Sequence, residues 1–388
     1  MTALLKAIFW PAVAALAWTQ IGYGALVVAL TRRGSRPGAR LATAPSAGTK
    51  AEASLPTVTL IIAAHNEASV IAAKVANARG LDYPGDRLEV IVAADGCTDD
   101  TVARATEAGA DAVLDLIRGG KVQAQDAGVR RASGEILAFS DANSTWEPGA
   151  LKCLVARFEE AKVGYVCGQV NFINPDGGDN QEGLYWRYEM MIRSAESQLS
   201  SVTGGNGAIY ATRRDSYVEM DPIMGHDLSF PFTMVKNGWR AVYEPRARAT
   251  ERMVPTVVGE YSRKRRMMSH AWPIVVQGGL ARLGNYPADY AGMVVSHRLL
   301  RYASPFLHIA ILAANLALVV RGARGLYAAS LAVQAAILLA ALSAPALSAR
   351  PFAVARYYVV TTAAIAGGLW DWRRHGTEAS WSPPEGTR

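Results

Sequence analysis

Three apolar segments that each lead into polar side chains constrain the fold of this chain more than any other feature. Continuous apolar runs separated by helical sequence are typical of parallel strands buried on both faces of a sheet. The carboxyl ends of parallel strands meet at one edge, where open α/β sheets bind ligands. The sequence therefore predicts a doubly wound α/β domain with a ligand site at that edge. The segments are 58–64, 88–94 and 136–139, and the polar residues after them include Glu67, Asp95 and Asp141.

The third segment leads into the turn Ser140-Asp141-Ala142-Asn143. Asp141 and Asn143 are separated by one residue, so both side chains can face the same cation from an irregular turn. Carboxylate and amide oxygens are the hard ligands that Mg²⁺ and Mn²⁺ prefer. We therefore expect a divalent cation here that bridges a diphosphate. Taken alone, such a triplet more often forms an ordinary turn, so the neighbouring motifs decide between the two interpretations.

Long apolar segments at both ends of the chain predict helices that cross a membrane. Hydrophobic residues make up 51% of the sequence, which is high for a soluble protein. Residues 4–30 carry a single charge, Lys6, and are long enough for a bilayer, which requires about 20 residues. Arginines follow at once and hold that side in the cytoplasm. Three further segments, 302–320, 326–342 and 352–370, also have the length of a bilayer.

The sequence does not decide on which side of the membrane the C-terminal tail lies. One helix before the domain and three after it would place the tail outside the cell. Arg373 and Arg374 directly follow the last apolar segment and argue for the cytoplasmic side. One alternative is that one of the three late segments lies along the membrane surface or re-enters it.

These features predict a multi-pass protein of the plasma membrane with its α/β domain in the cytoplasm. The net charge of +7 is assigned to contact with an anionic membrane surface, and no nucleic-acid-binding pattern is present. The expected parts are a transmembrane helix at 1–31, a linker at 32–55, the α/β domain at 56–254, basic interfacial helices at 255–301, about three transmembrane helices at 302–370 and a tail at 371–388.

Seven motifs, in their order and spacing, resemble those of family 2 glycosyltransferases. They are AHNEASVI, ADGCTDDT, RGGKVQAQDAG, FSDANSTWEPGAL, TGGNGAIYA, GHDLSFP and GWRAVYEPRARATE. The resemblance covers about residues 55–301 and implies a GT-A fold, a nucleotide-sugar-binding α/β domain with a doubly wound mixed sheet. With transmembrane helices at both ends, the chain is similar to the membrane-bound branch that includes chitooligosaccharide and hyaluronan synthases.

The resemblance implies a donor site at the strand ends. Glu67 would lie near the ribose of a uridine nucleotide and Asp95 near its base, with Lys121 orienting that end of the donor. Asp141 and Asn143 would occupy the D-x-D position that holds Mg²⁺ or Mn²⁺. The asparagine removes one negative charge, so weaker metal affinity is expected.

The basic segment Arg263–Met267 lies where processive relatives carry Q-x-x-R-W, and only Arg266 matches that motif. The resemblance implies that Arg266 contacts the donor diphosphate. Met267 replaces the tryptophan of processive relatives. The alternative for this segment is a basic cluster that faces anionic lipid.

An acceptor site and a catalytic base are also implied. Trp186, Gly205 and Asn206 match the part that shapes the acceptor site, since an aromatic ring can stack on a sugar and glycine permits a close approach. Helix packing and a tight turn are the alternatives. Asp227 falls on the catalytic base, and His226 replaces the first acid of the family's acidic pair. Without the motif, an Asp at this position would be interpreted as a helix N-cap.

The expected activity is inverting transfer of a sugar from a UDP-sugar to a hydroxyl of a lipid-linked or growing polysaccharide. Such a reaction requires stabilisation of a departing diphosphate and removal of a proton from the acceptor. Two alternatives stay open: sugar transfer to a polyprenyl phosphate, and a non-catalytic nucleotide-binding scaffold of a glycan-export complex. The donor sugar, the linkage and the oligomeric state are not predicted.

Overall fold

A mixed eight-stranded sheet forms the centre of the domain, in the order β3-β2-β1-β4-β7-β6-β8-β5. The computed structural model describes residues 1–34, 54–173, 182–252, 257–347 and 349–379. Its strands are β1 (Val58–Ala64), β2 (Leu88–Asp95), β3 (Ala112–Leu116), β4 (Ile136–Asp141), β5 (Thr145–Trp146), β6 (Val163–Ile173), β7 (Ile209–Arg213) and β8 (Arg240–Arg252).

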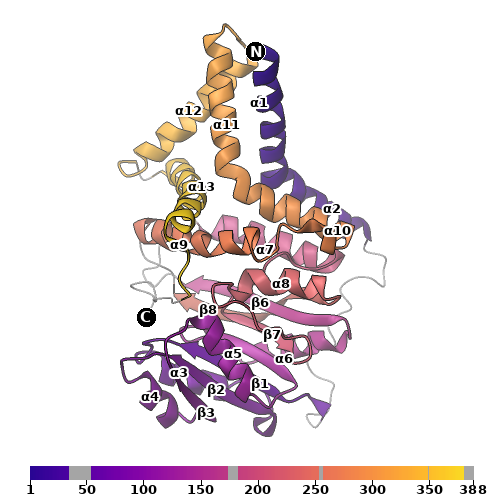
Figure 1. Ribbon diagram of the computed structural model, residues 1–388, viewed down its shortest axis with the longest axis vertical. Coiled ribbons are helices and arrows are strands. Elements are labelled where there is room, and N and C mark those ends of the chain that lie inside the picture. The colour runs from indigo at the N-terminus through magenta and orange to yellow at the C-terminus, as the bar shows by residue number, and fades with distance from the viewer. Residues whose placement is uncertain (35–53, 174–181, 253–256, 348, 380–388) are drawn as a thin grey trace.

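Helices cover both faces of this sheet (Figure 1). On one face, α3, α4 and α6 pack against apolar side chains such as Leu60 and Ile62 of β1. On the other face, α5, α7 and α8 cover Ile61 and Phe139. The helices are α3 (Ile71–Arg79), α4 (Thr101–Glu107), α5 (Lys121–Arg131), α6 (Ala150–Ala156), α7 (Glu182–Leu199) and α8 (His226–Lys236).

The register of the central strands confirms the predicted edge. β1 runs parallel to β2 and β4, with Ala64 opposite Ala94 and Ala63 opposite Asp141. The three strands therefore end together. β7 runs antiparallel to β4, with Ile209 opposite Ser140, so the segment that precedes β7 begins at the same edge.

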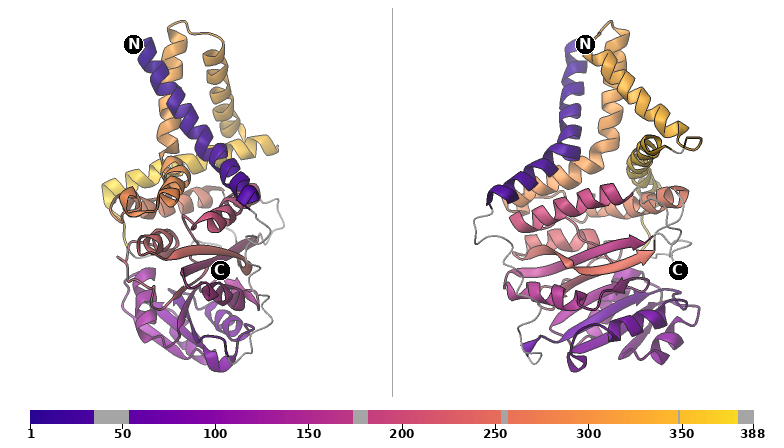
Figure 2. Two further views of the ribbon diagram at one scale, coloured as in Figure 1. Left: turned by 90° about the vertical axis from the view of Figure 1, so that its right-hand side faces the viewer. Right: turned by 180° about the vertical axis from the view of Figure 1, so that it is seen from behind.

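The remaining helices form a layer on one side of the domain and a group that projects from it (Figures 1 and 2). They are α1 (Thr2–Ala17), α2 (Tyr23–Gly34), α9 (Val257–Val276), α10 (Ala288–Met293), α11 (Leu300–Val320), α12 (Leu326–Ser343) and α13 (Arg350–His375). π-Helical turns at Trp18–Gly22 and Val294–Leu299 join α1 to α2 and α10 to α11. At these turns the chain passes from the layer into the projecting helices.

Four helical segments in the described part of the chain are long and apolar enough to cross a membrane. They are Thr2–Arg33, Ala288–Val320, Leu326–Ser343 and Arg350–His375. This agrees with the expected helices at both ends of the chain, although the first two segments extend further into the layer on the domain than the apolar runs indicated.

Helix α13 differs from the other late helices because it lies along α9 rather than projecting (Figure 2). Arg265 of α9 forms an ion pair of 2.6 Å with Asp371 of α13. Gly368 lies so close to α9 that a Cβ there would be 2.7 Å from the backbone nitrogen of Ser269. Close packing of this kind fixes α13 on the side of the domain.

Candidate active site

The strand ends and the loop before α5 form the first part of the site. Asp95 ends β2 and is buried. Its carboxylate accepts hydrogen bonds from the backbone N–H groups of Gly119 at 2.6 Å and Gly120 at 3.0 Å. Gly120 has a φ of +95°, which glycine adopts without strain. Glu67 is fully buried near the end of β1, and its N–H donates to Thr101 at 2.8 Å.

Lys121, the first residue of α5, connects this loop to the end of β4. Its ammonium group donates a short hydrogen bond to Asp141. Burial opposes the charge of Lys121, but Asp141, Asp227 and Glu251 hold its pKa above the ordinary value. The lysine is therefore a cation among three carboxylates. The side chain lies on the Asp141 side of the loop, while the backbone of the preceding glycine binds Asp95.

A second lysine supports the turn after β4. Lys74 of α3 is buried and donates to the backbone carbonyl of Ser144 at 2.7 Å. Its ammonium group also lies 5.2 Å from the centre of the Trp146 ring. Burial lowers the pKa of Lys74 to about 7. This lysine holds the backbone of the segment that carries Asn143 and gives the turn a fixed shape.

Glu251, near the end of β8, approaches the same turn from another strand. β8 pairs with β5 in antiparallel register, with Thr250 opposite Thr145. Glu251, the next residue of β8, therefore lies beside Ser144. Burial and the neighbouring Asp141 carboxylate raise the pKa of Glu251. Its Oε1 atom is buried and has no hydrogen-bond partner among the described residues.

The first turn of α8 carries His226 and Asp227. Gly225 is the N-cap of this helix, and no side chain caps it. The Asp227 carboxylate has no hydrogen-bond partner in the described ranges, and the residue is partly exposed. His226 is buried and forms a 2.8 Å hydrogen bond with Tyr210. Burial and the nearby Lys121 charge hold the pKa of His226 well below its ordinary value, so this imidazole is neutral.

The loop before β7 lies against this helix turn. The N–H of Gly205 donates to the backbone carbonyl of Asp227 at 2.6 Å. A Cβ on Gly205 would come within 1.9 Å of the Tyr165 hydroxyl, so only glycine fits there. The Asn206 amide is used within the protein, donating to Gly168 at 2.6 Å and accepting from Ile209 at 2.9 Å.

Trp186 of α7 is held by packing. Its ring nitrogen donates to Val170 at 3.0 Å, and its ring packs edge-on against Phe172. The Arg193 guanidinium lies 6.0 Å from the centre of the same ring and donates to the carbonyl of Gly205 at 3.0 Å. Trp186 therefore contributes to the wall behind the loop.

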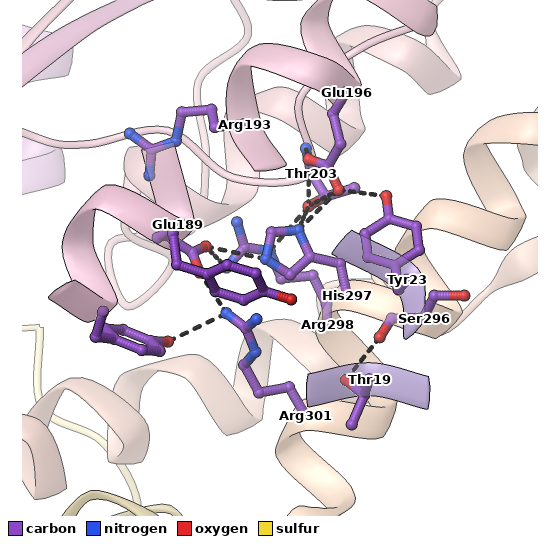
Figure 3. Close-up of polar contacts among 12 residues, drawn as sticks. Thr19, Tyr23, Glu189, Arg193, Glu196, Thr203, Ser296, His297, Arg298 and Arg301 are labelled. Carbon is purple, nitrogen blue, oxygen red and sulfur yellow. Dashed lines mark hydrogen bonds and ion pairs between the residues drawn. The ribbon is translucent and has the colours of Figure 1, made fainter. Parts of the chain in front are cut away.

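A buried ionic cluster connects this loop to α2 and to the π-helical turn before α11 (Figure 3). Glu196 of α7 accepts from Tyr23 at 2.7 Å, from His297 at 2.7 Å and from the backbone N–H of Thr203 at 3.0 Å. Arg298 donates to the Thr203 hydroxyl at 3.0 Å. Residues from α2, α7 and the turn before α11 thus fix the start of the loop that reaches Asp227.

A second carboxylate in this cluster, Glu189, pairs with the same helical turn. It lies 3.0 Å from His297, 3.7 Å from Arg298 and in direct contact with Arg301. Burial opposes its ionisation, but Arg301, His297 and Arg298 hold the pKa of Glu189 well below its ordinary value. Both carboxylates of the cluster are therefore charged.

Arg266 lies on α9, in the basic stretch that follows β8. It is exposed, and burial of part of its side chain together with the charge of Arg263 lowers its pKa. Arg263 also interacts electrostatically with Glu251. The basic segment therefore lies beside the strand end that approaches Asp141.

The structure brings together Lys121, Asp141 and Asp227, which the sequence predicted for the site. The sequence assigned no role to Lys74, to Glu251 or to the ionic cluster. Two sequence features could have indicated the cluster. Glu189 and Glu196 are seven residues apart on one helix, and His297-Arg298 lies in an apolar segment. Such spacing places both acids on the same side of a helix. No local pattern indicated that β8 would bring Glu251 to the turn after β4.

This sheet, its strand-end site and the apolar helices define a class of protein: a GT-A-type α/β domain with helices long enough to cross a membrane at both ends of the chain. The family model described as glycosyl transferase family 2 matches residues 59–219. Residues 59–219 are therefore similar to a family 2 glycosyl transferase domain.

Relatives and a solved structure agree with this assignment. Glycosyltransferase AglE of Haloferax volcanii is 28% identical over 180 residues, which are 45% of this chain and 58% of that protein. A beta-monoglucosyldiacylglycerol synthase of Nostoc is 34% identical over 122 residues, which are 30% of this chain and 26% of that protein. The chain thus spans less than two thirds of either relative.

The mannosyltransferase PcManGT from Pyrobaculum calidifontis, solved in complex with GDP-Man and Mn²⁺, has a similar fold over nearly the whole chain. The TM-score is 0.71 at 21% identity, and the match covers 96% of this chain and 100% of the other. This similarity extends the shared fold beyond the α/β domain to the helices at both ends.

Proposed function

We propose that the protein is an inverting glycosyltransferase that moves a sugar from a UDP-sugar to a hydroxyl of a lipid-linked or growing glycan at the membrane. The observation that carries this proposal is the position of Lys121. Its ammonium group contacts Asp141 at the donor edge, and its charge also interacts with Asp227 in the first turn of α8. A donor held at Asp141 would therefore have its reacting sugar near Asp227.

The turn after β4 suits a divalent cation. Asp141 and Asn143 offer a carboxylate and an amide oxygen, and the unpartnered Oε1 of Glu251 lies beside the same turn. These are hard oxygen ligands of the kind that Mg²⁺ and Mn²⁺ take. When bound, such a cation would neutralise charge that develops on the departing diphosphate.

The residues of this chain supply the other requirements of the reaction. We propose that Lys121 and Arg266 add positive charge around the diphosphate. Asp227 would accept the proton of the attacking hydroxyl, and its carboxylate is available because no residue in the described ranges donates a hydrogen bond to it. A single displacement with one base on the acceptor side inverts the anomeric configuration.

Two features support the acceptor class. An acceptor phosphate is already an anion and needs no base, so an available Asp227 favours a hydroxyl over a polyprenyl phosphate. The loop before β7 is held by residues of the helices that could cross the membrane, which favours an acceptor that is presented at the membrane.

The test is product analysis with the full-length protein purified in detergent. UDP- and GDP-sugars would each be incubated with a lipid extract and Mn²⁺ or EDTA, and new glycolipids would be identified by mass spectrometry. We expect a glycosylated lipid from a UDP-sugar that disappears in excess EDTA. A product made only on polyprenyl phosphate, or full turnover in EDTA, would contradict the proposed acceptor or the proposed cation, respectively.

A further inference from the structure

A carboxylate oxygen near the end of β8 is the strongest unexplained feature of the site. Glu251 is the last residue of the motif GWRAVYEPRARATE, and the sequence assigns no role to it. Its Oε1 is buried without a hydrogen-bond partner in the part of the chain that the structure describes. A buried acceptor that is left unpaired costs about 1–3 kcal/mol, and more when it is charged. A buried group of this kind calls for a specific explanation, and a bound ion is one such explanation.

The strand register determines where this oxygen lies. Thr250 is opposite Thr145 and Ala249 is opposite Trp146 in the antiparallel pair of β8 and β5. Continuing this pairing by one step places Glu251 opposite Ser144, the residue that follows Asn143. The interaction between the charges of Glu251 and Asp141 shows that the two carboxylates share one region.

The lysines of the site do not satisfy this oxygen. The ammonium group of Lys121 donates to Asp141 and to the carbonyl of Gly207, while Lys74 donates to the carbonyl of Ser144. Two neighbouring carboxylates repel each other, and a diphosphate would add further negative charge. A divalent cation between them would offset that repulsion.

We propose that Glu251 is the third protein ligand of the divalent cation, together with Asp141 and Asn143. This proposal rests on the proposed use of a cation by the enzyme. Two carboxylates and one amide restore the charge that Asn143 removes from the D-x-D position. The site would thus combine a turn after β4 with the end of a strand more than 100 residues later in the sequence.

Direct measurement of Mn²⁺ binding tests this assignment without activity. Full-length protein in detergent, free of nucleotide, would be titrated with Mn²⁺ and the free ion followed by electron paramagnetic resonance. We expect Glu251→Gln to weaken Mn²⁺ binding at least about tenfold, because even groups that only support a ligand cost 10–100-fold. Glu147→Gln is the matched control, since it removes the same charge at an exposed position beside β5 and should leave the affinity unchanged.

Glu251→Asp keeps the charge with a shorter side chain and should bind Mn²⁺ with intermediate affinity, which guards against a glutamine variant that fails to fold. Equal Mn²⁺ affinity in the wild type and Glu251→Gln would overturn the assignment and make Glu251 a counter-ion of the lysines. A wild type that binds no Mn²⁺ would overturn the proposed cation as well, so the two failures are distinguishable.

Discussion

Asp227 is the residue on which the reaction type depends, and its position in α8 separates two interpretations. A helix N-cap lies one residue before the first helical residue and accepts hydrogen bonds from the first turn. Gly225 occupies that position here, and Asp227 is the second residue of the helix. Its side chain therefore does not act as the cap, which leaves the carboxylate for another role.

We predict that Asp227→Asn preserves donor binding and lowers transfer by about 10² to 10⁴, because asparagine keeps the shape of the side chain but accepts no proton. Donor affinity would be measured by calorimetry and turnover by released UDP, both with saturating Mn²⁺. His226→Ala should cost less, since His226 neighbours the base without being one. Turnover near that of the wild type in Asp227→Asn would remove the base assignment.

In the proposed cation site, Asn143 supplies an uncharged ligand. Replacing its amide by a carboxylate adds a negative charge to the oxygen ligands, so Asn143→Asp should tighten the apparent Mn²⁺ affinity. The measurement is a Mn²⁺ titration of UDP release. An unchanged titration curve would mean that Asn143 is not a ligand.

Among the elements, α7 connects the α/β domain to α2 and to the π-helical turn before α11. Its glutamates pair with Arg298, Arg301 and His297, and the start of the loop before β7 is held between them. Removing one partner of a buried ion pair costs about 3–5 kcal/mol because the other charge is left unpaired. The position of the loop at Asp227 therefore depends on helices that lie outside the α/β domain.

We predict that Glu189→Gln lowers the melting temperature of the full-length protein at neutral pH. Because the folded-state pKa of Glu189 lies well below its ordinary value of 4.5, its stabilisation is present above about pH 4.5 and is lost as the pH falls through the folded pKa. The difference in melting temperature between wild type and variant should therefore shrink in acid. Thermal unfolding in detergent between about pH 7 and pH 2.5 measures this, because the loss takes place below about pH 4.5.

Glu219→Gln is the control for that experiment, since Glu219 forms an exposed ion pair with Arg130 and such pairs contribute little. Its melting temperature should follow that of the wild type. A deficit of Glu189→Gln that stayed constant down to about pH 2.5 would mean that the charge of Glu189 does not contribute to stability.

The elements were predictable to different degrees. β1, β2 and β4 were predictable because a central parallel strand needs apolar side chains on both faces. β1 has the predicted bounds, while β2 ends one residue and β4 two residues after the predicted end. The pairing of β5 with β8 was not predictable. It joins segments more than 100 residues apart, and short strands carry no local pattern that names their partner.

At the scale of the whole molecule, α13 bears on which helices cross the membrane. It packs along α9, and the chain after it returns to the domain. Thr377 donates to the carbonyl of Ser269 at 2.8 Å, and a Cβ on Gly120 would be 2.1 Å from the carbonyl oxygen of Ala379. The end of α13 therefore lies on the same side as the α/β domain.

This arrangement favours one of the two topologies that the sequence left open. If α13 lies at the membrane surface, α1, α11 and α12 remain as spans, and Arg373 and Arg374 are on the cytoplasmic side, in agreement with the positive-inside rule. At the opposite end of the molecule, Arg321 contacts Met1. The turn between α11 and α12 and the N-terminus would then share the outer side.

Cysteine labelling in intact cells tests this topology. Lys162, Arg324 and Arg374 are exposed, so each can be replaced by cysteine without disturbing the core. With a membrane-impermeant maleimide, Arg324→Cys should react in intact cells because it lies in the outer turn. Lys162→Cys in the domain and Arg374→Cys at the end of α13 should react only after the membrane is permeabilised, as should the partly exposed native Cys97 and Cys153. Reaction of Arg374→Cys in intact cells would mean that α13 crosses the membrane. Reaction of Lys162→Cys in intact cells would place the catalytic domain outside the cell, away from cytosolic nucleotide sugars.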